Sequence, residues 1–179
     1  MCQSSIDNDH IPVLIIVMGV SGSGKSSVAK ALAQHYQYLY LDADDFHSEA
    51  AKAQMAAGTP LTDELRAPWV HNISAYLNEC FQKGTSCTLA FSGLRQAHRD
   101  TLRQLPFNIV FLHLEGSKAL IASRMNDRSD HFMPTSLLDS QFDSLEPCNQ
   151  ESDIISVDIT PPLERVIDSC YRDIEAKLG

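Results

Sequence analysis

Short apolar runs alternate with stretches of helical periodicity along the whole chain. Apolar runs at residues 13–18, 38–41, 88–91, 107–114 and 154–159 predict five strands. Near-continuous apolar runs are typical of parallel strands that are covered on both faces. The alternation of strands with helices predicts an α/β fold, a three-layer sandwich built on a parallel sheet.

Apolar side chains at three- and four-residue spacing predict a helix after each strand. Gly58 suits a left-handed cap at the end of a helix over residues 48–57, and residues 59–65 read as loop. Pro68 suits the first position of the next helix. Four further helices are expected. One carries His98, Arg99 and Arg103, and the next begins at Ser117 and ends at Arg124. A third covers residues 137–145, and the last follows Pro162. Some of the basic side chains of the helix with His98 are expected to face substrate.

A glycine-rich segment follows the first strand directly and precedes the first helix. Its backbone amides can converge on phosphate oxygens, Lys25 can reach the outer phosphates, and Ser26 can ligate Mg²⁺. The strand, loop and helix together predict a P-loop that binds a nucleoside triphosphate, the alternative being a glycine-rich turn. The predicted nucleotide-binding residues are Gly19, Ser21, Gly22, Ser23, Gly24, Lys25, Ser26 and Ser27.

Acidic residues come at the end of the second predicted strand. Ligands of open parallel sheets gather beyond the carboxyl ends of the strands, so Asp42 and Asp44 are expected beside the P-loop. Two carboxylates at this spacing suit two roles: one holds a metal-bound water, and the other orients or deprotonates a hydroxyl nucleophile. An acidic turn without chemistry is the alternative.

The polar stretch at residues 125–136 lacks helical periodicity and is a candidate lid. A kinase must exclude water, which competes as acceptor, and must neutralise the transferring phosphoryl group. Arg124 and Arg128 can serve these needs. A surface loop with ordinary charges is the alternative.

Length and charge narrow the class of protein. The 179 residues, 44% of them hydrophobic, suit a single domain over residues 1–179. A net charge of −9 opposes attraction to nucleic acid or to anionic membranes, and a small-molecule partner is expected. The five cysteines show no metal-ligand spacing and read as reduced packing residues. Without a signal or membrane-spanning pattern, a cytoplasmic location is expected.

The chain resembles the gluconokinases, P-loop sugar-acid kinases related to shikimate and adenylate kinases. The resemblance rests on residues 18–26, 42–45 with His47, 58–63 with Arg66, Pro68 and Trp69, 131–134, 140–142 and 145–147. It implies a five-stranded sheet in the order 2-3-1-4-5, use of ATP with Mg²⁺, and phosphorylation of D-gluconate to 6-phospho-D-gluconate. The oligomeric state, monomer or homodimer, stays open.

The resemblance also implies roles for individual residues. Lys25, Asp44 and Arg128 would be catalytic, with Asp44 orienting or deprotonating the gluconate hydroxyl. Ser26, and Asp42 through a water, would hold the metal, while Arg124 and Arg128 would lie near the nucleotide. The acceptor would be bound by Asp44, His47, Arg66, Arg95, His98 and Gln141.

The departures from the family pattern concentrate on the acceptor side. They are Ser48, Ala51, Gln54, Leu65 and Arg95, the last in place of a lysine. An arginine keeps the charge but changes reach and hydrogen-bond geometry. Alternatives therefore stay open: a shikimate-type kinase, a kinase for another aldonate, or a nucleotide-dependent switch, although the chain has no Asn-Lys-x-Asp segment. The negative net charge of the chain disfavours a nucleic-acid kinase.

Overall fold

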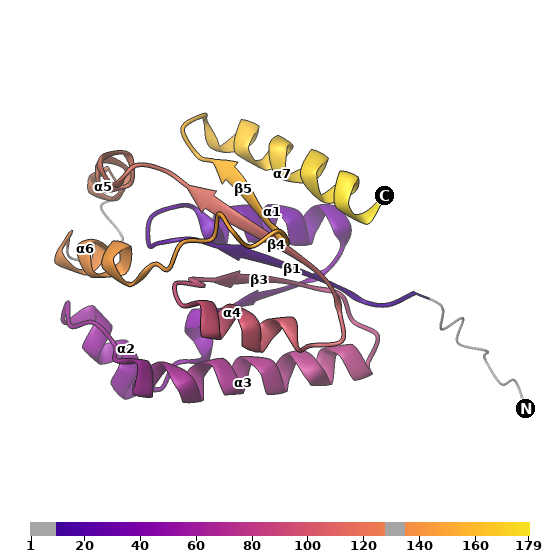
Figure 1. Ribbon diagram of the computed structural model, residues 1–179, viewed down its shortest axis with the longest axis horizontal. Coiled ribbons are helices and arrows are strands. Elements are labelled where there is room, and N and C mark those ends of the chain that lie inside the picture. Colours follow the sequence, from indigo (N-terminus) through magenta and orange to yellow (C-terminus); the bar gives the residue numbers. More distant parts are fainter. Residues whose placement is uncertain (1–9, 128–134) are drawn as a thin grey trace, which may run out of the picture.

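A parallel sheet forms the centre of the computed structural model, which describes residues 10–127 and 135–179 (Figure 1). Within these residues, five strands lie in the order β2-β3-β1-β4-β5, and every neighbouring pair is parallel. The strands are β1 (Val13–Met18), β2 (Leu39–Asp42), β3 (Cys87–Phe91), β4 (Asn108–Glu115) and β5 (Ile154–Asp158). The predicted strands and their order are confirmed.

Helices cover both faces of this sheet, as Figure 1 shows. They are α1 (Lys25–Tyr36), the 3₁₀ helix η1 (Ala43–Phe46), α2 (Glu49–Ala56), α3 (Asp63–Gln82), α4 (Gln96–Arg103), α5 (Lys118–Asn126), α6 (Thr135–Ser144) and α7 (Leu163–Leu178). Helices α1 and α7 pack on one face, and α3 and α4 pack on the other. The result is the predicted three-layer sandwich.

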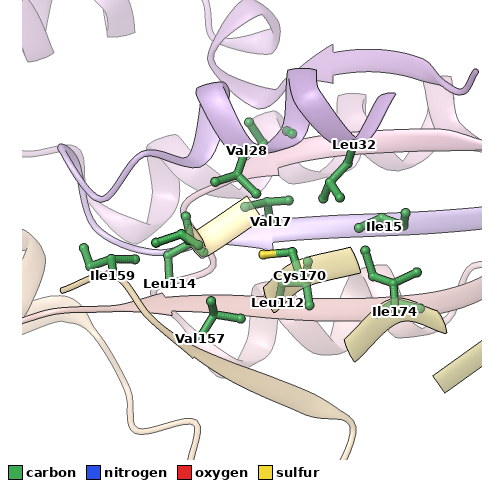
Figure 2. Packing of buried hydrophobic residues seen from close by; sticks show 14 of the residues in the cluster. Ile15, Val17, Val28, Leu32, Leu112, Leu114, Val157, Ile159, Cys170 and Ile174 are labelled. Carbon is green, nitrogen blue, oxygen red and sulfur yellow. The ribbon is translucent and has the colours of Figure 1, made fainter. Parts of the chain in front are cut away.

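The two hydrophobic clusters meet at β1, whose side chains alternate between them. Ile15 and Val17 join the cluster with α1 and α7, of which Figure 2 shows the packing. Leu14 and Ile16 join the cluster with α3. Because both faces of β1 are buried, the strand reads as a continuous apolar run.

The predicted start of α3 at Pro68 is wrong. The helix begins at Asp63, and the side-chain oxygen of Thr62 accepts a hydrogen bond from the Leu65 amide at 3.4 Å. A threonine cap followed by Asp63 and Glu64 in the first turn is a sufficient start signal, because the side chain and the two acids satisfy the helix N-terminus. Pro68 lies inside the helix, and the earlier start places Arg66 in its first turns and takes residues 63–65 out of the predicted loop over 59–65.

Two further observations bear on class and packing. In the described parts of the chain, no helix combines the length and apolar character needed to cross a membrane. Cys80, Cys87, Cys148 and Cys170 are buried and free, as expected of packing residues, and Cys2 lies outside the described residues.

Candidate active site

The P-loop joins β1 to α1 at the carboxyl edge of the sheet. Its first residue is held by a hydrogen bond from the Gly19 amide to the Ser92 carbonyl at 3.2 Å. Gly22 has a φ of 80°, and a Cβ there would lie 2.7 Å from the Met125 side chain. Glycine is required at this position because the backbone is left-handed and α5 approaches closely.

A cavity of about 350 Å³ opens beside the loop, and most of the predicted nucleotide-binding residues line it. We call it the donor cavity. It is lined by Ser21, Gly22, Gly24, Lys25, Ser26, Ser27, Lys30, Asp42, Asp44, Ala90, Ser92, Arg124 and Met125. The structure thus brings Asp42, Asp44 and Arg124 to the P-loop. Gly19 and Ser23 belong to the loop without lining the cavity.

Lys30 and Ser92 are lining residues that the sequence interpretation missed. Lys30 follows Ser26 and Ser27 by four and three residues, so helical periodicity places it on their face of α1. Ser92 directly follows β3, at the edge of the sheet where ligands gather. Both signals were present in the sequence.

The Lys25 ammonium group lies within the electrostatic influence of Asp44 and Asp42. Its Nζ donates to the Val20 carbonyl at 3.0 Å. Burial lowers the pKa of Lys25, and the charges of Asp44 and Asp42 oppose that effect. This ammonium group is therefore held at the phosphate loop with acidic neighbours.

Asp42 and Asp44 have different environments. Asp42 Oδ2 accepts from Ser26 Oγ at 3.3 Å and from the Tyr40 hydroxyl at 3.2 Å, while its Oδ1 accepts from the Asp44 amide at 3.0 Å. Burial is the main cause that raises the pKa of Tyr40 to about 12, so the phenol stays a donor. Asp44 lines the cavity, and desolvation, followed by the charge of Asp42, raises the pKa of its carboxyl group.

A second, smaller cavity lies on the acceptor side, with a volume of about 50 Å³. It is lined by His47, Met55, Pro60, Leu61, Arg66, Trp69, Leu137, Ser140 and Gln141. His47 stacks on Trp69 with ring centroids 4.4 Å apart, and Trp69 Nε1 donates to the Ala43 carbonyl at 2.6 Å. Desolvation, with the nearby charges of Arg66 and Lys52, lowers the pKa of His47 to about 4.

Arg95 and His98 lie next to this cavity without lining it. Arg95 Nε lies 3.4 Å from Asp63 Oδ1, which also lies 3.5 Å from Arg66 Nη1. The His98 ring is edge-on to Trp69 at 6.4 Å. Asp63 therefore joins two arginines that the resemblance places at the acceptor.

Gln141 connects the two cavities. Its Oε1 accepts from the Ser21 amide at 2.6 Å, and its Nε2 donates to Ser21 Oγ at 3.0 Å. The same side chain lines the acceptor cavity. The predicted acceptor residue is thus also a contact of the P-loop.

The comparisons with known proteins agree with this geometry. The family described as an AAA domain matches residues 14–148. The thermoresistant gluconokinase of Escherichia coli is 36% identical over 174 residues, which cover 97% of this chain and 98% of that protein. The chain belongs to the gluconokinase family. It is accordingly a small-molecule kinase with a P-loop nucleotide site.

Solved structures of similar proteins show the same fold. A gluconokinase from Sinorhizobium meliloti 1021 superimposes with a TM-score of 0.78 at 38% identity, covering 89% of each chain. A sugar kinase from Janibacter sp. HTCC2649 gives a TM-score of 0.86 at 37% identity, covering 92% of this chain and 95% of the other.

Most departures from the gluconokinase pattern have local structural roles. Ser48 Oγ accepts from the Ala51 amide at 3.1 Å and caps α2, in which Ala51 is buried. Gln54 Nε2 donates to the Pro60 carbonyl at 3.0 Å, and Leu65 is exposed on α3. Among the residues that the structure describes, none of these four lines either cavity.

The predicted lid and its arginines are only partly described. Arg124 Nη2 lies 3.4 Å from the carbonyls of Thr160 and Pro161, after β5. Helix α5 continues two residues beyond Arg124, to Asn126, and α6 begins at Thr135. Arg128 and residues 128–134 of the predicted lid over 125–136 lie outside the described residues.

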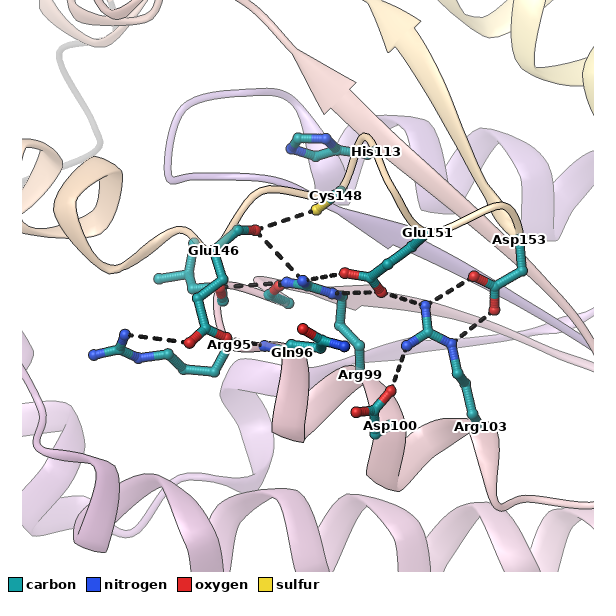
Figure 3. Close-up of polar contacts among 12 residues, drawn as sticks. Arg95, Gln96, Arg99, Asp100, Arg103, His113, Glu146, Cys148, Glu151 and Asp153 are labelled. Carbon is teal, nitrogen blue, oxygen red and sulfur yellow. Dashed lines mark hydrogen bonds and ion pairs between the residues drawn. The ribbon is translucent and has the colours of Figure 1, made fainter.

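Two of the three basic residues named for α4, Arg99 and Arg103, line neither cavity, so the expectation that some basic residues of this helix face substrate is left to His98. The guanidinium groups of Arg99 and Arg103 both pair with Glu151 (Figure 3). Helical periodicity predicts that these two arginines lie on one face of the helix. Their acidic partner is about fifty residues away in the sequence, so no local pattern predicts the pairing.

Proposed function

We propose that this kinase transfers the γ-phosphoryl group of ATP to D-gluconate, forming ADP and 6-phospho-D-gluconate. The observation that carries the proposal is that η1 joins the two cavities: Asp44 lines the donor cavity and His47, three residues on, lines the acceptor cavity. A hydroxyl bound near His47 would therefore lie next to Asp44 and the outer phosphates, as in-line transfer requires.

Asp44 has the properties of the residue that receives the hydroxyl proton. In the proposed step the gluconate oxygen bonds to the γ-phosphorus, the bond to the β-phosphate oxygen breaks, and the proton passes to the Asp44 carboxylate. The raised pKa of Asp44 favours that proton transfer. Lys25, Arg124 and Arg128 are proposed to stabilise the charge of the phosphates.

The donor cavity fits a magnesium ion. Ser26 Oγ and Asp42 Oδ2 lie 3.3 Å apart, and hydroxyl and carboxylate oxygens are ligands that Mg²⁺ prefers. We propose that Ser26 binds the ion directly and Asp42 through a water. When bound, the ion would supply charge neutralisation at the β- and γ-phosphates.

The acceptor side combines groups that suit a sugar acid. Arg66 and Arg95 offer guanidinium donors that match a carboxylate, while Gln141 can bind hydroxyl groups. His47 is neutral at pH 7 because its pKa is about 4, so it can donate or accept a hydrogen bond to a hydroxyl. We propose that His98 also binds the acceptor, from its position beside the cavity.

The test is ADP release with a panel of acceptors: D-gluconate, D-galactonate, shikimate and no acceptor. We expect stimulation by D-gluconate, with a product phosphorylated at O6 by NMR. Lys25→Ala, in which the phosphate-facing ammonium is lost, is expected to abolish turnover while keeping the folded circular dichroism spectrum. Turnover with shikimate or galactonate and none with gluconate would refute the proposed acceptor; nucleotide binding without stimulation by any acceptor would favour a switch.

A further inference from the structure

Arg99 is a fully buried arginine that neither cavity uses. It lies in α4, and none of its surface is exposed. A buried guanidinium is costly unless its donors are paired, and breaking such a pair leaves an uncompensated charge. The partners of Arg99 therefore show what this residue holds in place.

The Arg99 guanidinium joins the turn just before its own helix to Glu146 and Glu151, about fifty residues further along the chain (Figure 3). Nη1 donates to the Gly93 carbonyl at 2.6 Å and to the Leu94 carbonyl at 3.3 Å, in the turn between β3 and α4. Nη2 donates to the Glu146 carbonyl at 3.4 Å, after α6. Nε donates to Glu151 Oε2 at 3.2 Å, before β5, and Nη2 pairs with the other oxygen of that carboxylate.

The turn held by Arg99 carries one residue that lines the donor cavity and one that lies next to the acceptor cavity. On the donor side, the Ser92 carbonyl accepts from the Gly19 amide of the P-loop, and Ser92 lines the donor cavity. On the acceptor side, Arg95 faces Asp63. Between them Gly93 has a φ of 62°, so the turn has a left-handed backbone.

Glu146 binds the same turn as Arg99. Its amide donates to the Leu94 carbonyl at 2.8 Å, and its Oε2 accepts from the Gln96 amide at the start of α4. Its Oε1 also lies 3.9 Å from Arg95 Nη1. With Arg99 bound to the Glu146 carbonyl, the turn and the segment after α6 form one hydrogen-bonded unit.

We propose that Arg99, fixed by Glu151, is a positioning residue for the acceptor: it holds the turn between β3 and α4 so that Arg95 stays at the edge of the acceptor cavity. The guanidinium itself touches no substrate and acts through the Gly93 and Leu94 carbonyls. This inference rests on the proposed function, because it assigns Arg95 to acceptor binding.

Arg103 offers a matched control on the same helix. It pairs with the same carboxylate of Glu151, and its Nε lies 2.7 Å from Asp153 Oδ2. Its Nη1 pairs with Asp100 at 2.6 Å, and its guanidinium lies over the Phe111 ring, 5.0 Å from the ring centroid. Arg103 therefore shares the ionic cluster of Arg99 without binding the turn.

The experiment compares Arg99→Met with Arg103→Met by steady-state kinetics and by amide hydrogen exchange. In Arg99→Met we expect the KM for gluconate to rise between about tenfold and a hundredfold, since small displacements of a positioning group have effects of this size. The KM for ATP should change less than the KM for gluconate, because Ser92 comes before the carbonyls that Arg99 binds and is also held by the Gly19 amide, and exchange in residues 92–96 should accelerate. In Arg103→Met the gluconate KM and the exchange of this turn should match the wild type.

Arg99→Lys gives a milder second variant. Lysine keeps the charge but loses the planar fork, so an intermediate gluconate KM is expected, and this variant carries the comparison if Arg99→Met does not fold. Equal gluconate KM and equal exchange of residues 92–96 in the Arg99 and Arg103 variants would overturn the proposal. Failure of the wild type to phosphorylate gluconate would instead refute the proposed function, and the exchange comparison would still decide whether Arg99 holds the turn.

Discussion

Asp44 is the single residue on which the proposed proton transfer depends. Asp44→Asn keeps the size of the side chain and removes the proton acceptor, so turnover should fall by about 10²- to 10⁴-fold. Nucleotide binding, followed by the rise in melting temperature with an ATP analogue, should persist because the P-loop is unchanged.

The neighbouring Asp45 supplies the control, because it is exposed and does not line the donor cavity. Asp45→Asn should keep turnover near that of the wild type. A turnover of Asp44→Asn close to normal at neutral pH would show that this carboxylate has no role in proton transfer.

His47 predicts a specific pH dependence of stability. Its pKa is about 4 in the folded protein and near 6.5 when unfolded, so between these values the unfolded state binds more protons. The contribution of His47 to stability therefore grows as pH rises from 4 to 6.5 and is lost as pH falls. In urea unfolding, His47→Gln should remove a slope of up to about 1.4 kcal/mol per pH unit.

His71, an exposed histidine on α3, supplies the matched variant His71→Gln. This substitution should leave the steep part of the wild-type curve in place. Parallel curves for His47→Gln and the wild type over pH 4 to 6.5 would mean that the stacked imidazole is protonated equally in both states.

At the scale of elements, the first turn of α3 connects stability to acceptor binding. The Thr62 cap fixes the turn that carries Asp63 and Arg66. Thr62→Ala should lower the free energy of unfolding by about 1 kcal/mol. It should also raise the KM for gluconate, measured by coupled ADP release, because Arg66 moves with the frayed turn.

Ser117 caps α5 in the same way, with its Oγ accepting from the Leu120 amide at 3.1 Å. Ser117→Ala should lower the free energy of unfolding by a similar amount. Because α5 carries Arg124 at the donor cavity, this variant should raise the KM for ATP and not the KM for gluconate. Identical kinetic changes in the two cap variants would contradict this division of the site between α3 and α5.

At the scale of the whole molecule, the two hydrophobic clusters share one sheet. Leu32 lies in one cluster and Leu77 in the other, both with no exposed surface. Because β1 contributes side chains to both, we expect calorimetry to show a single cooperative transition. Leu32→Ala and Leu77→Ala should each lower stability by about 2–5 kcal/mol and shift that same transition.

Two separate transitions, each sensitive to only one of these substitutions, would contradict the prediction of a single domain over residues 1–179. The monomeric or homodimeric state and the cytoplasmic location stay predictions.

The local features of the molecule were predictable from sequence to different degrees. The P-loop and β1 were predictable because a strand, a glycine-rich turn and a helix N-terminus depend on neighbouring residues. Two local signals compete at the start of α3: Pro68 predicts a later start, but the Thr62 cap sets the observed one. The family resemblance, and not periodicity, gave the strand order.

Local sequence is enough to predict the phosphate loop, the strands and the acidic turn at Asp44, since each depends on backbone conformation and periodicity within a few residues. The contact of Gln141 with Ser21 and the position of Asp63 between Arg66 and Arg95 are visible only in the folded chain. So is the pairing of Arg99 with Glu151, away from both cavities. These are pairings between distant segments, and a charged side chain on a helix shows which partner it has only when the chain is folded.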